Sequence, residues 1–273
     1  MKPSTQTLGT AITVVTLLLE LTGPAAADGG NCVPLPADAR LPDLQTIVPD
    51  HLNLVNQQQR EILRFSNAIA NTGAGPLELH PLSQDPRVFN DAQQNVYNAQ
   101  NAAAGFPVCH KHLTEAFFFH PEHNHWHLKD VALFEVRSAA PGDDGTGGQW
   151  GPVLGNSVKE TFCLIDYVPI NGSKPESRAY FSCFGDQGIS VDWSDQYHHS
   201  TELQDVEITG APEGVYYLVS KANPVEIFLE SNYANNVAWA SFRLSRQSNG
   251  NSKIAVISHS ACTGDLCGYS TNR

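Results

Sequence analysis

The chain has 273 residues and a formal net charge of −12 at pH 7, with 28 acidic residues against 16 basic ones. A strongly acidic chain repels nucleic acid and anionic membranes, so we expect neither as a partner. The charge is compatible with a cationic substrate, and equally with an acidic surface that serves solubility alone. No Pro/Ser-rich linker or fixed-period repeat divides the sequence, and its length suits a single large domain.

The N-terminus resembles an export signal. Met1 and Lys2 precede a mainly apolar run, and Pro24 is followed by three alanines that form an A-x-A type cleavage site. We expect residues 1–27 to be removed and the mature protein to be secreted as one domain, residues 28–273. Residues 28–42 are rich in Gly, Pro and Ala and are expected to form an irregular arm.

All six cysteines lie after residue 27, where an oxidising environment favours disulfides. Three bridges are possible, and only the last two cysteines are near neighbours in the sequence. The absence of a Cys-x-x-Cys pair beside the histidines argues against a zinc–thiolate site. The cysteines are Cys32, Cys109, Cys163, Cys183, Cys262 and Cys267.

Short alternating segments separated by turn residues predict strands, not helices. With no long 3.6-period segment among them, they predict an all-β, antiparallel β-sandwich with long loops, braced by disulfides. Residues 84–105 fit a hairpin, a short helix or a loop equally well. The expected strands cover residues 61–69, 77–79, 120–127, 157–166, 203–209, 215–221, 237–244 and 253–258.

Four of the eleven histidines fall between positions 120 and 127. In an extended strand, side chains alternate between faces, so His123, His125 and His127 would project from the same side. Three converging imidazoles make a metal site, whereas His120 is out of phase and is expected to support it. Imidazole suits copper, zinc, iron and nickel, so the spacing does not select the ion.

Six segments, in a single order, closely resemble the catalytic domain of the lysyl oxidase family over residues 117–245. A weaker resemblance extends over residues 62–79. The segments are His-Pro-Glu-His-Asn-His-Trp-His at 120–127, Val158–Asp166, Phe181–Cys183 with Gln187 and Gly188, Asp195–Tyr197, Gln204 with Glu207–Thr209, and Glu230–Val237.

The resemblance implies a secreted copper amine oxidase that makes a lysine tyrosylquinone from its own side chains. The matching positions are Lys159, which we place on a strand, and Tyr197, which we place in a loop. The copper ligands of the family match His123, His125 and His127. Such an enzyme converts primary amines, expected here to be lysine side chains of peptides, to aldehydes with dioxygen, and releases hydrogen peroxide and ammonia.

Two further roles follow from the resemblance and the chemistry. Asp195, two residues before Tyr197, is the candidate base for proton abstraction, because a carboxylate with a raised pKa suits that step; His198 and His199 compete for the role. Cys163 and Cys183 match a bonded pair of the family, which leaves Cys32 for Cys109.

The chain also departs from the animal members of the family. Glu122 stands where they have a cysteine, and Trp193 and the two histidines after Tyr197 stand where they have others. Two alternatives stay open: an exported copper-binding sandwich without oxidase activity, and a three-histidine zinc hydrolase with Glu122 as its base. The matched Lys159 and Tyr197 argue against the first, because a storage site does not need them.

Overall fold

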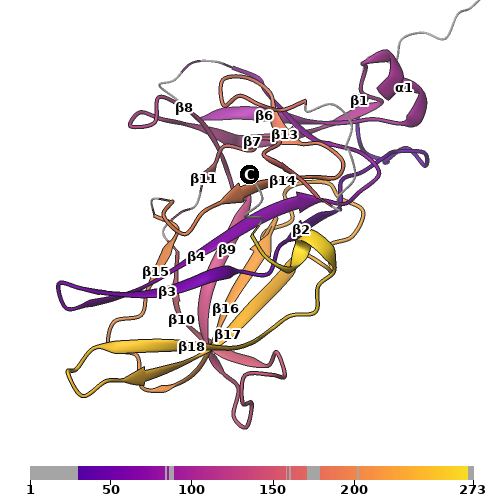
Figure 1. The fold of residues 1–273 in the computed structure, drawn as a ribbon. Coiled ribbons are helices and arrows are strands. Elements are labelled where there is room, and N and C mark those ends of the chain that lie inside the picture. Colours follow the sequence, from indigo (N-terminus) through magenta and orange to yellow (C-terminus); the bar gives the residue numbers. More distant parts are fainter. Residues whose placement is uncertain are drawn as a thin grey trace, which may run out of the picture.

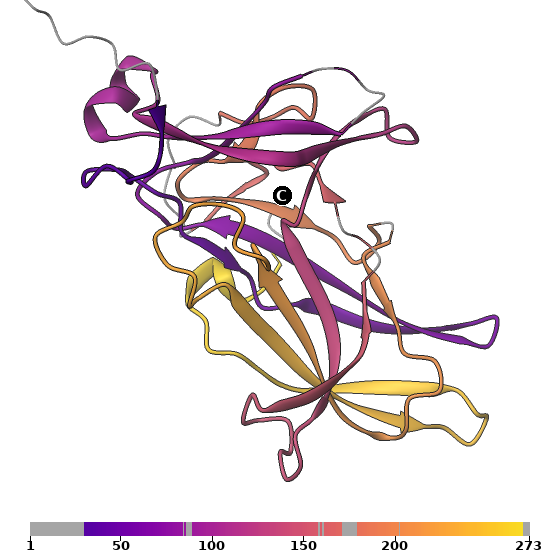
Figure 2. The same cartoon turned by 180° about the vertical axis from the view of Figure 1, so that it is seen from behind.

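The chain folds almost entirely into β-strands, as a computed structural model shows from two sides (Figures 1 and 2). The expected all-β antiparallel fold is confirmed: among the described residues, every strand pair is antiparallel except β1–β7. No helix in the described part of the chain is long and apolar enough to cross a bilayer. The structure describes residues 30–83, 85, 89–157, 159, 161–170, 179–201 and 203–269.

The strands form three sheets, stacked from top to bottom in Figure 1. The top sheet runs β11 (Thr161–Phe162), β8 (His125–Lys129), β7 (Cys109–His120), β6 (Asn90–Val96), β5 (Leu77–Pro81) and β13 (Gln187–Ile189), with β1 (Gly30–Asn31) beside β7. The middle sheet contains β12 (Val168–Pro169), β14 (Trp193–Tyr197), β4 (Arg60–Asn71) and β15 (Asp205–Glu207), with β2 (Leu44–Thr46) and β3 (Asp50–Gln57) also on β4. The lower sheet runs β10 (Trp150–Asn156), β9 (Ala132–Ala139), β16 (Gly214–Ala222), β17 (Val237–Arg246) and β18 (Ser252–His259).

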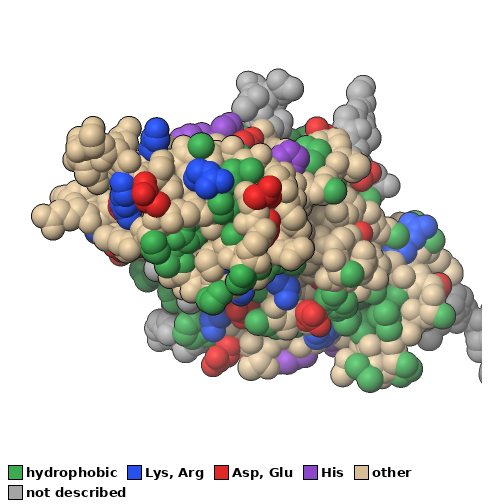
Figure 3. Space-filling model, turned by 90° about the horizontal axis from the view of Figure 1, so that it is seen from below, with side chains coloured by type: hydrophobic (Ala, Val, Ile, Leu, Met, Phe, Trp, Pro, Cys, Tyr) green, Lys and Arg blue, Asp and Glu red, His purple; other side chains and the backbone are tan. Residues whose placement is uncertain are grey.

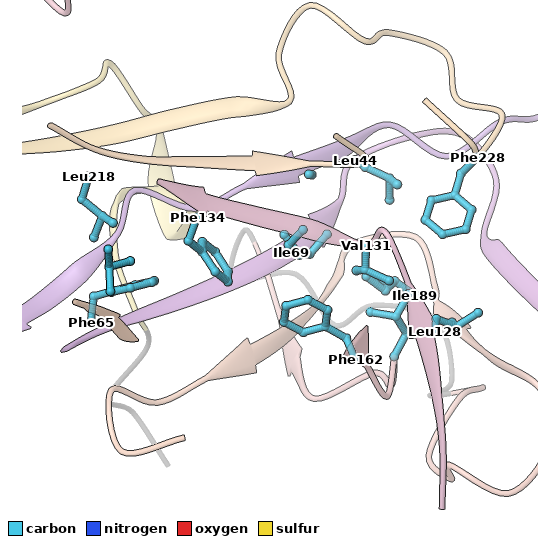
Figure 4. Packing of buried hydrophobic residues seen from close by; sticks show 14 of the residues in the cluster. Leu44, Phe65, Ile69, Leu128, Val131, Phe134, Phe162, Ile189, Leu218 and Phe228 are labelled. Carbon is cyan, nitrogen blue, oxygen red and sulfur yellow. The ribbon is translucent and has the colours of Figure 1, made fainter. Parts of the chain in front are cut away.

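One hydrophobic cluster joins the three sheets. Phe162 of the top sheet, Ile69 of the middle sheet and Phe134 of the lower sheet are all essentially inaccessible to solvent and point into the same interior (Figure 4). The rings of Phe134 and Phe162 meet edge to face at 6.2 Å. Burying such rings is worth about 1.5–3 kcal/mol each, so the strand that carries Phe162 is firmly anchored although it is only two residues long.

The undecided segment 84–105 contains both a strand and a helix. Strand β6 covers Asn90–Val96, and α1 covers Ala99–Ala104; residues 84 and 86–88 lie outside the described part. Asn98 caps the helix by accepting a hydrogen bond from the backbone of Asn101. Gly105 ends it with a φ of 76°, a left-handed conformation that glycine adopts without strain. Residues 90–96 are extended because β6 pairs on both of its edges, with β5 and with β7.

The arm that was expected to be irregular is tied to the top sheet in its described part. Gly30–Asn31 pairs with β7, and Cys32 is bonded to Cys109 at the start of that strand. Two other disulfides, Cys163–Cys183 and Cys262–Cys267, complete the expected set. The predicted export signal, residues 1–27, lies outside the described residues. A short 3₁₀ helix, η1 (Gly264–Cys267), lies inside the last disulfide loop.

Candidate metal and amine-oxidation site

The histidines do not share one strand, and that expectation is wrong. Strand β7 ends at His120, residues 121–124 form a turn, and β8 begins at His125, which pairs directly with His120. Pro121 has no N–H with which to continue the ladder, and Asn124 adopts a φ of 54°, which asparagine tolerates. The turn therefore splits the motif into a hairpin.

The hairpin nevertheless brings the predicted trio together. The potential ligand atoms of His123, His125 and His127 all lie within 4.8 Å of one another. His125 and His127 are two apart on β8 and share a face, and their Nε2 atoms are 2.9 Å apart. Two nitrogens that each bind one ion at about 2 Å come to about this separation, so the pair fits a shared metal. His123 reaches them from the turn.

His120 belongs to the same group of rings. It stacks on His123 with ring centres 4.1 Å apart, and its ring centre is 5.1 Å from that of His127. Its Nδ1 is buried and has no hydrogen-bond partner among the residues that the structure describes. The supporting role of His120 stays a prediction, but the four imidazoles are packed together as that role requires.

The environment keeps the strand histidines neutral. Burial, followed by the positive charge of Lys159, lowers the pKa of His127 to about 3. Burial and then the neighbouring His123 also lower the pKa of His125. A metal binds the neutral imidazole, so this pair needs no proton loss at pH 7. In the metal-binding tautomer, Nδ1 of His127 donates to Oγ1 of Thr161 at 2.9 Å, which fixes the ring and leaves Nε2 for the ion.

Tyr197 lies at the end of strand β14, not in a loop as expected. Strand β14 was not predicted from the sequence. Its central residues Ser194, Asp195 and Gln196 are polar although they are buried, so the usual apolar pattern of a buried strand is missing. The phenol oxygen of Tyr197 donates to Oδ2 of Asp195 at 2.5 Å and lies 2.9 Å from the carbonyl oxygen of Cys163. Burial foremost, and then Asp195, raise the pKa of Tyr197 well above its usual value.

Lys159 lies beside the tyrosine, although not on the long strand predicted for residues 157–166. That strand is reduced to Thr161–Phe162, and positions 158 and 160 are outside the described residues. The Nζ atom of Lys159 is 5.6 Å from the centre of the Tyr197 ring and 5.0 Å from that of Phe162. The lysine and the tyrosine are therefore neighbours in space.

Asp195 is nearly inaccessible to solvent, with 3% of its surface exposed. Burial raises its pKa to about 8, against the opposing effects of the Tyr197 hydroxyl and Lys159. A carboxyl group with a pKa near neutrality suits proton transfer. The two competing bases lie elsewhere: the rings of His198 and His199 are 3.8 Å apart and pack beside His51.

The histidine trio, Lys159, Asp195 and Tyr197 line one cavity of about 270 Å³. The Cys163–Cys183 disulfide, Ile165 and Tyr167 also form part of its wall. The sequence analysis did not assign a role to Thr161. Its spacing of two from Lys159 in the strand expected at residues 157–166 was the available signal, because residues two apart in a strand share a face.

Comparisons with known proteins cover the part of the chain that builds this cavity. A family model described as lysyl oxidase matches residues 84–253, which include all the cavity-lining residues named above. Lysyl oxidase homolog 2 of Homo sapiens is 30% identical over 130 residues, which are 46% of this chain and 15% of that protein. Lysyl oxidase homolog 3B of Danio rerio is 24% identical over 217 residues, 68% of this chain and 25% of that protein. The matches thus cover only a small part of these relatives, but more than half of this chain is matched by the family model, and the chain belongs to the lysyl oxidase family.

Proposed function

We propose that the protein is a secreted amine oxidase that depends on copper and on a quinone made from Lys159 and Tyr197. It converts primary amines, above all the lysine side chains of peptides, to aldehydes, with dioxygen consumed and hydrogen peroxide and ammonia released. The observation that carries the proposal is the 5.6 Å distance from Nζ of Lys159 to the Tyr197 ring, inside the cavity that also holds the histidine trio. A pure metal-storage site has no use for this pair.

The residues present fit both groups. His123, His125 and His127 would hold the copper, since neutral imidazoles are good ligands for it. When bound, the copper and the quinone would supply the redox chemistry, taking electrons from the amine and passing them to dioxygen. Zinc would supply no such redox chemistry, and Glu122, the base that a zinc hydrolase would need, lies exposed in the turn.

The protein itself supplies binding, orientation and proton transfer. Ile165, the ring of Tyr167 and the disulfide give the cavity an apolar wall against which an aliphatic amine can pack. Asp195 would accept the proton from the carbon that bears the amine. Its position beside the Tyr197 hydroxyl places this base next to the site of the cofactor.

The substrate proposal does not require a dense acidic surface. On the face shown in Figure 3, acidic and basic side chains are interspersed and do not gather into one acidic patch. The overall charge of −12 still favours the approach of cationic lysine side chains over a long range. Export is proposed from the apolar N-terminal run and agrees with the three disulfides.

The deciding experiment measures the cofactor directly. Copper-loaded wild-type protein should show a visible quinone absorbance that survives denaturation, and proteolysis should yield a crosslinked peptide that joins the segments around Lys159 and Tyr197. Lys159→Arg keeps the charge and should lack both signals while still binding copper. Full copper binding by the wild type with neither signal would refute the oxidase and leave the alternative, an exported copper-binding protein without oxidase activity.

A further inference from the structure

Strand β8, which carries His125 and His127, loses its neighbour partway along its length. Strand β11 pairs with it only at Thr161–Lys129 and Phe162–Leu128. The same register, continued, would place Leu164 directly opposite Trp126. Instead the chain leaves the ladder after Phe162, and the backbone groups of these two residues need other partners.

The side chain of Gln187 fills the gap. Its Oε1 accepts a hydrogen bond from the backbone N–H of Leu164 at 3.0 Å, and its Nε2 donates to the carbonyl oxygen of Trp126 at 2.7 Å. The carboxamide thus acts as an extra peptide unit inserted between two segments that would otherwise pair directly. It satisfies one donor and one acceptor that are buried from water.

Gln187 is held firmly in this position. The residue is inaccessible to solvent, and its backbone pairs with Leu79 in the top sheet. The next residue, Gly188, donates from its backbone to the carbonyl of Leu164 at 3.1 Å. A Cβ atom at position 188 would lie only 2.0 Å from the carbonyl oxygen of Leu77, so only glycine allows this close approach.

The carboxamide of Gln187 lies between the segment that carries the histidines and the segment that contacts Tyr197. Trp126 stands between His125 and His127, and Leu164 follows Cys163, whose carbonyl oxygen lies 2.9 Å from the Tyr197 phenol. We propose that Gln187 is a positioning residue that holds the histidine strand apart from the Cys163 segment. It thereby sets the distance between the metal ligands and the tyrosine; its consequence for quinone formation rests on the proposed function.

A second glutamine provides a matched control. Gln94 is equally buried, and its carboxamide also bridges a backbone donor and acceptor, both of Leu229, at 2.7 and 2.8 Å. Neither glutamine lines the cavity, but Gln187 bonds to the backbone of the histidine strand and Gln94 does not. Replacing either glutamine by methionine removes its hydrogen bonds to these backbone groups while keeping a side chain of similar length; Gln187 also loses a longer one, 3.4 Å from its Nε2 to the carbonyl oxygen of Cys183. Both variants should therefore lose a similar amount of thermal stability.

Only Gln187→Met should affect the site. We expect its copper affinity and its rate of quinone formation to fall about tenfold or more, the usual cost of losing an outer support of a metal site. Its copper(II) electron paramagnetic resonance spectrum should also change. Gln94→Met should match the wild type in all three. Wild-type copper affinity and spectrum in Gln187→Met, or equal losses in Gln94→Met, would overturn the proposal.

The two readouts separate this inference from the proposed function. Copper affinity and the copper spectrum report on the histidines without any turnover, so they test Gln187 even if the wild type forms no quinone. Gln187→Glu serves as a second variant, because it keeps the oxygen that faces Leu164 and loses the donor to Trp126; we expect the same change of spectrum. If neither Gln187 variant folds while Gln94→Met does, Gln187 is a general requirement of the fold and the narrower role is wrong.

Discussion

The phenol oxygen of Tyr197 lies 2.5 Å from the carboxylate of Asp195, and both side chains belong to the same strand. Alternation along β14 places residues 195 and 197 on one face, so this contact needs no loop rearrangement. The proposed base and the proposed precursor of the cofactor are thus held together by local backbone geometry.

Turnover should depend on Asp195 and on pH. The carboxyl must be ionised to accept a proton, and burial raises its pKa to about 8, so the rate should rise with pH through about 8. Asp195→Asn should lower kcat by about 10²–10⁴-fold. Steady-state kinetics on a primary amine from pH 6 to 10 test this. The prediction fails if the variant retains the wild-type rate and pH profile.

Asp195 should also make stability depend on pH. Its pKa is higher in the folded protein, about 8, than in an unfolded chain, about 4. The neutral carboxyl therefore favours folding below pH 4, and this contribution is lost as pH rises through 8. The free energy of unfolding of the wild type should therefore fall relative to that of Asp195→Asn as pH rises from 5 to 9. Urea unfolding of the two copper-free proteins measures this difference. A constant difference between the two proteins would contradict the buried, protonated carboxyl.

Thr161 should tune the metal site through His127. Removing the hydroxyl in Thr161→Val takes away the group that orients the ring, and copper affinity should fall about 10–100-fold. Thr161→Ser keeps the hydroxyl and should stay within a few-fold of the wild type. Competition titrations with a copper chelator measure both. Equal affinity in the valine and serine variants would exclude this support.

Two disulfides should separate stability from function. Replacing Cys163 and Cys183 by serine opens a loop with a sequence separation of 20, which costs about 3 kcal/mol in the chain-entropy picture. The same change at Cys32 and Cys109, with a separation of 77, should cost more, about 4.5 kcal/mol.

Only the first of these bridges lines the cavity, and only Cys163 offers its carbonyl to Tyr197. Quinone yield per bound copper should therefore drop in the Cys163/Cys183 variant and stay normal in the Cys32/Cys109 variant, measured well below both unfolding temperatures. The opposite order of quinone yields would show that the Cys163–Cys183 bridge does not brace the site.

The sequence predicted the fold class because most core strands alternate in the ordinary way. The expected strands at residues 215–221 and 237–244 correspond to β16 and β17, and their alternate residues Tyr216 and Leu218, and Phe242 and Leu244, lie in the main hydrophobic cluster. It did not predict β14, since buried polar side chains that hydrogen-bond within the site replace the apolar pattern there. The division of the strands into three sheets could not be predicted either, because strands that pair but lie far apart in the chain leave no local pattern in the sequence.

His123, His125 and His127 cluster as expected, although the reason given for it was wrong, and their metal role stays a prediction. Alternation does place His125 and His127 on one face, but His123 joins them because Pro121 and Asn124 make a turn. Both a strand and a hairpin bring these three rings together, so the pattern could not distinguish them. Gln187 was visible only as part of a family-like segment, because its two partners are backbone groups that a sequence does not display.

The lower sheet supplies none of the residues that line the cavity. The loop of residues 141–149 between β9 and β10 lies at the far end of the molecule from β8 and β14 in Figure 1. An affinity tag, a reporter or a whole second domain would thus have room of its own at the exposed Pro141 and Gly142, whereas Asp143, Gly145 and Gly148 of the same loop hydrogen-bond to Tyr217 and Ser241 and should be left intact.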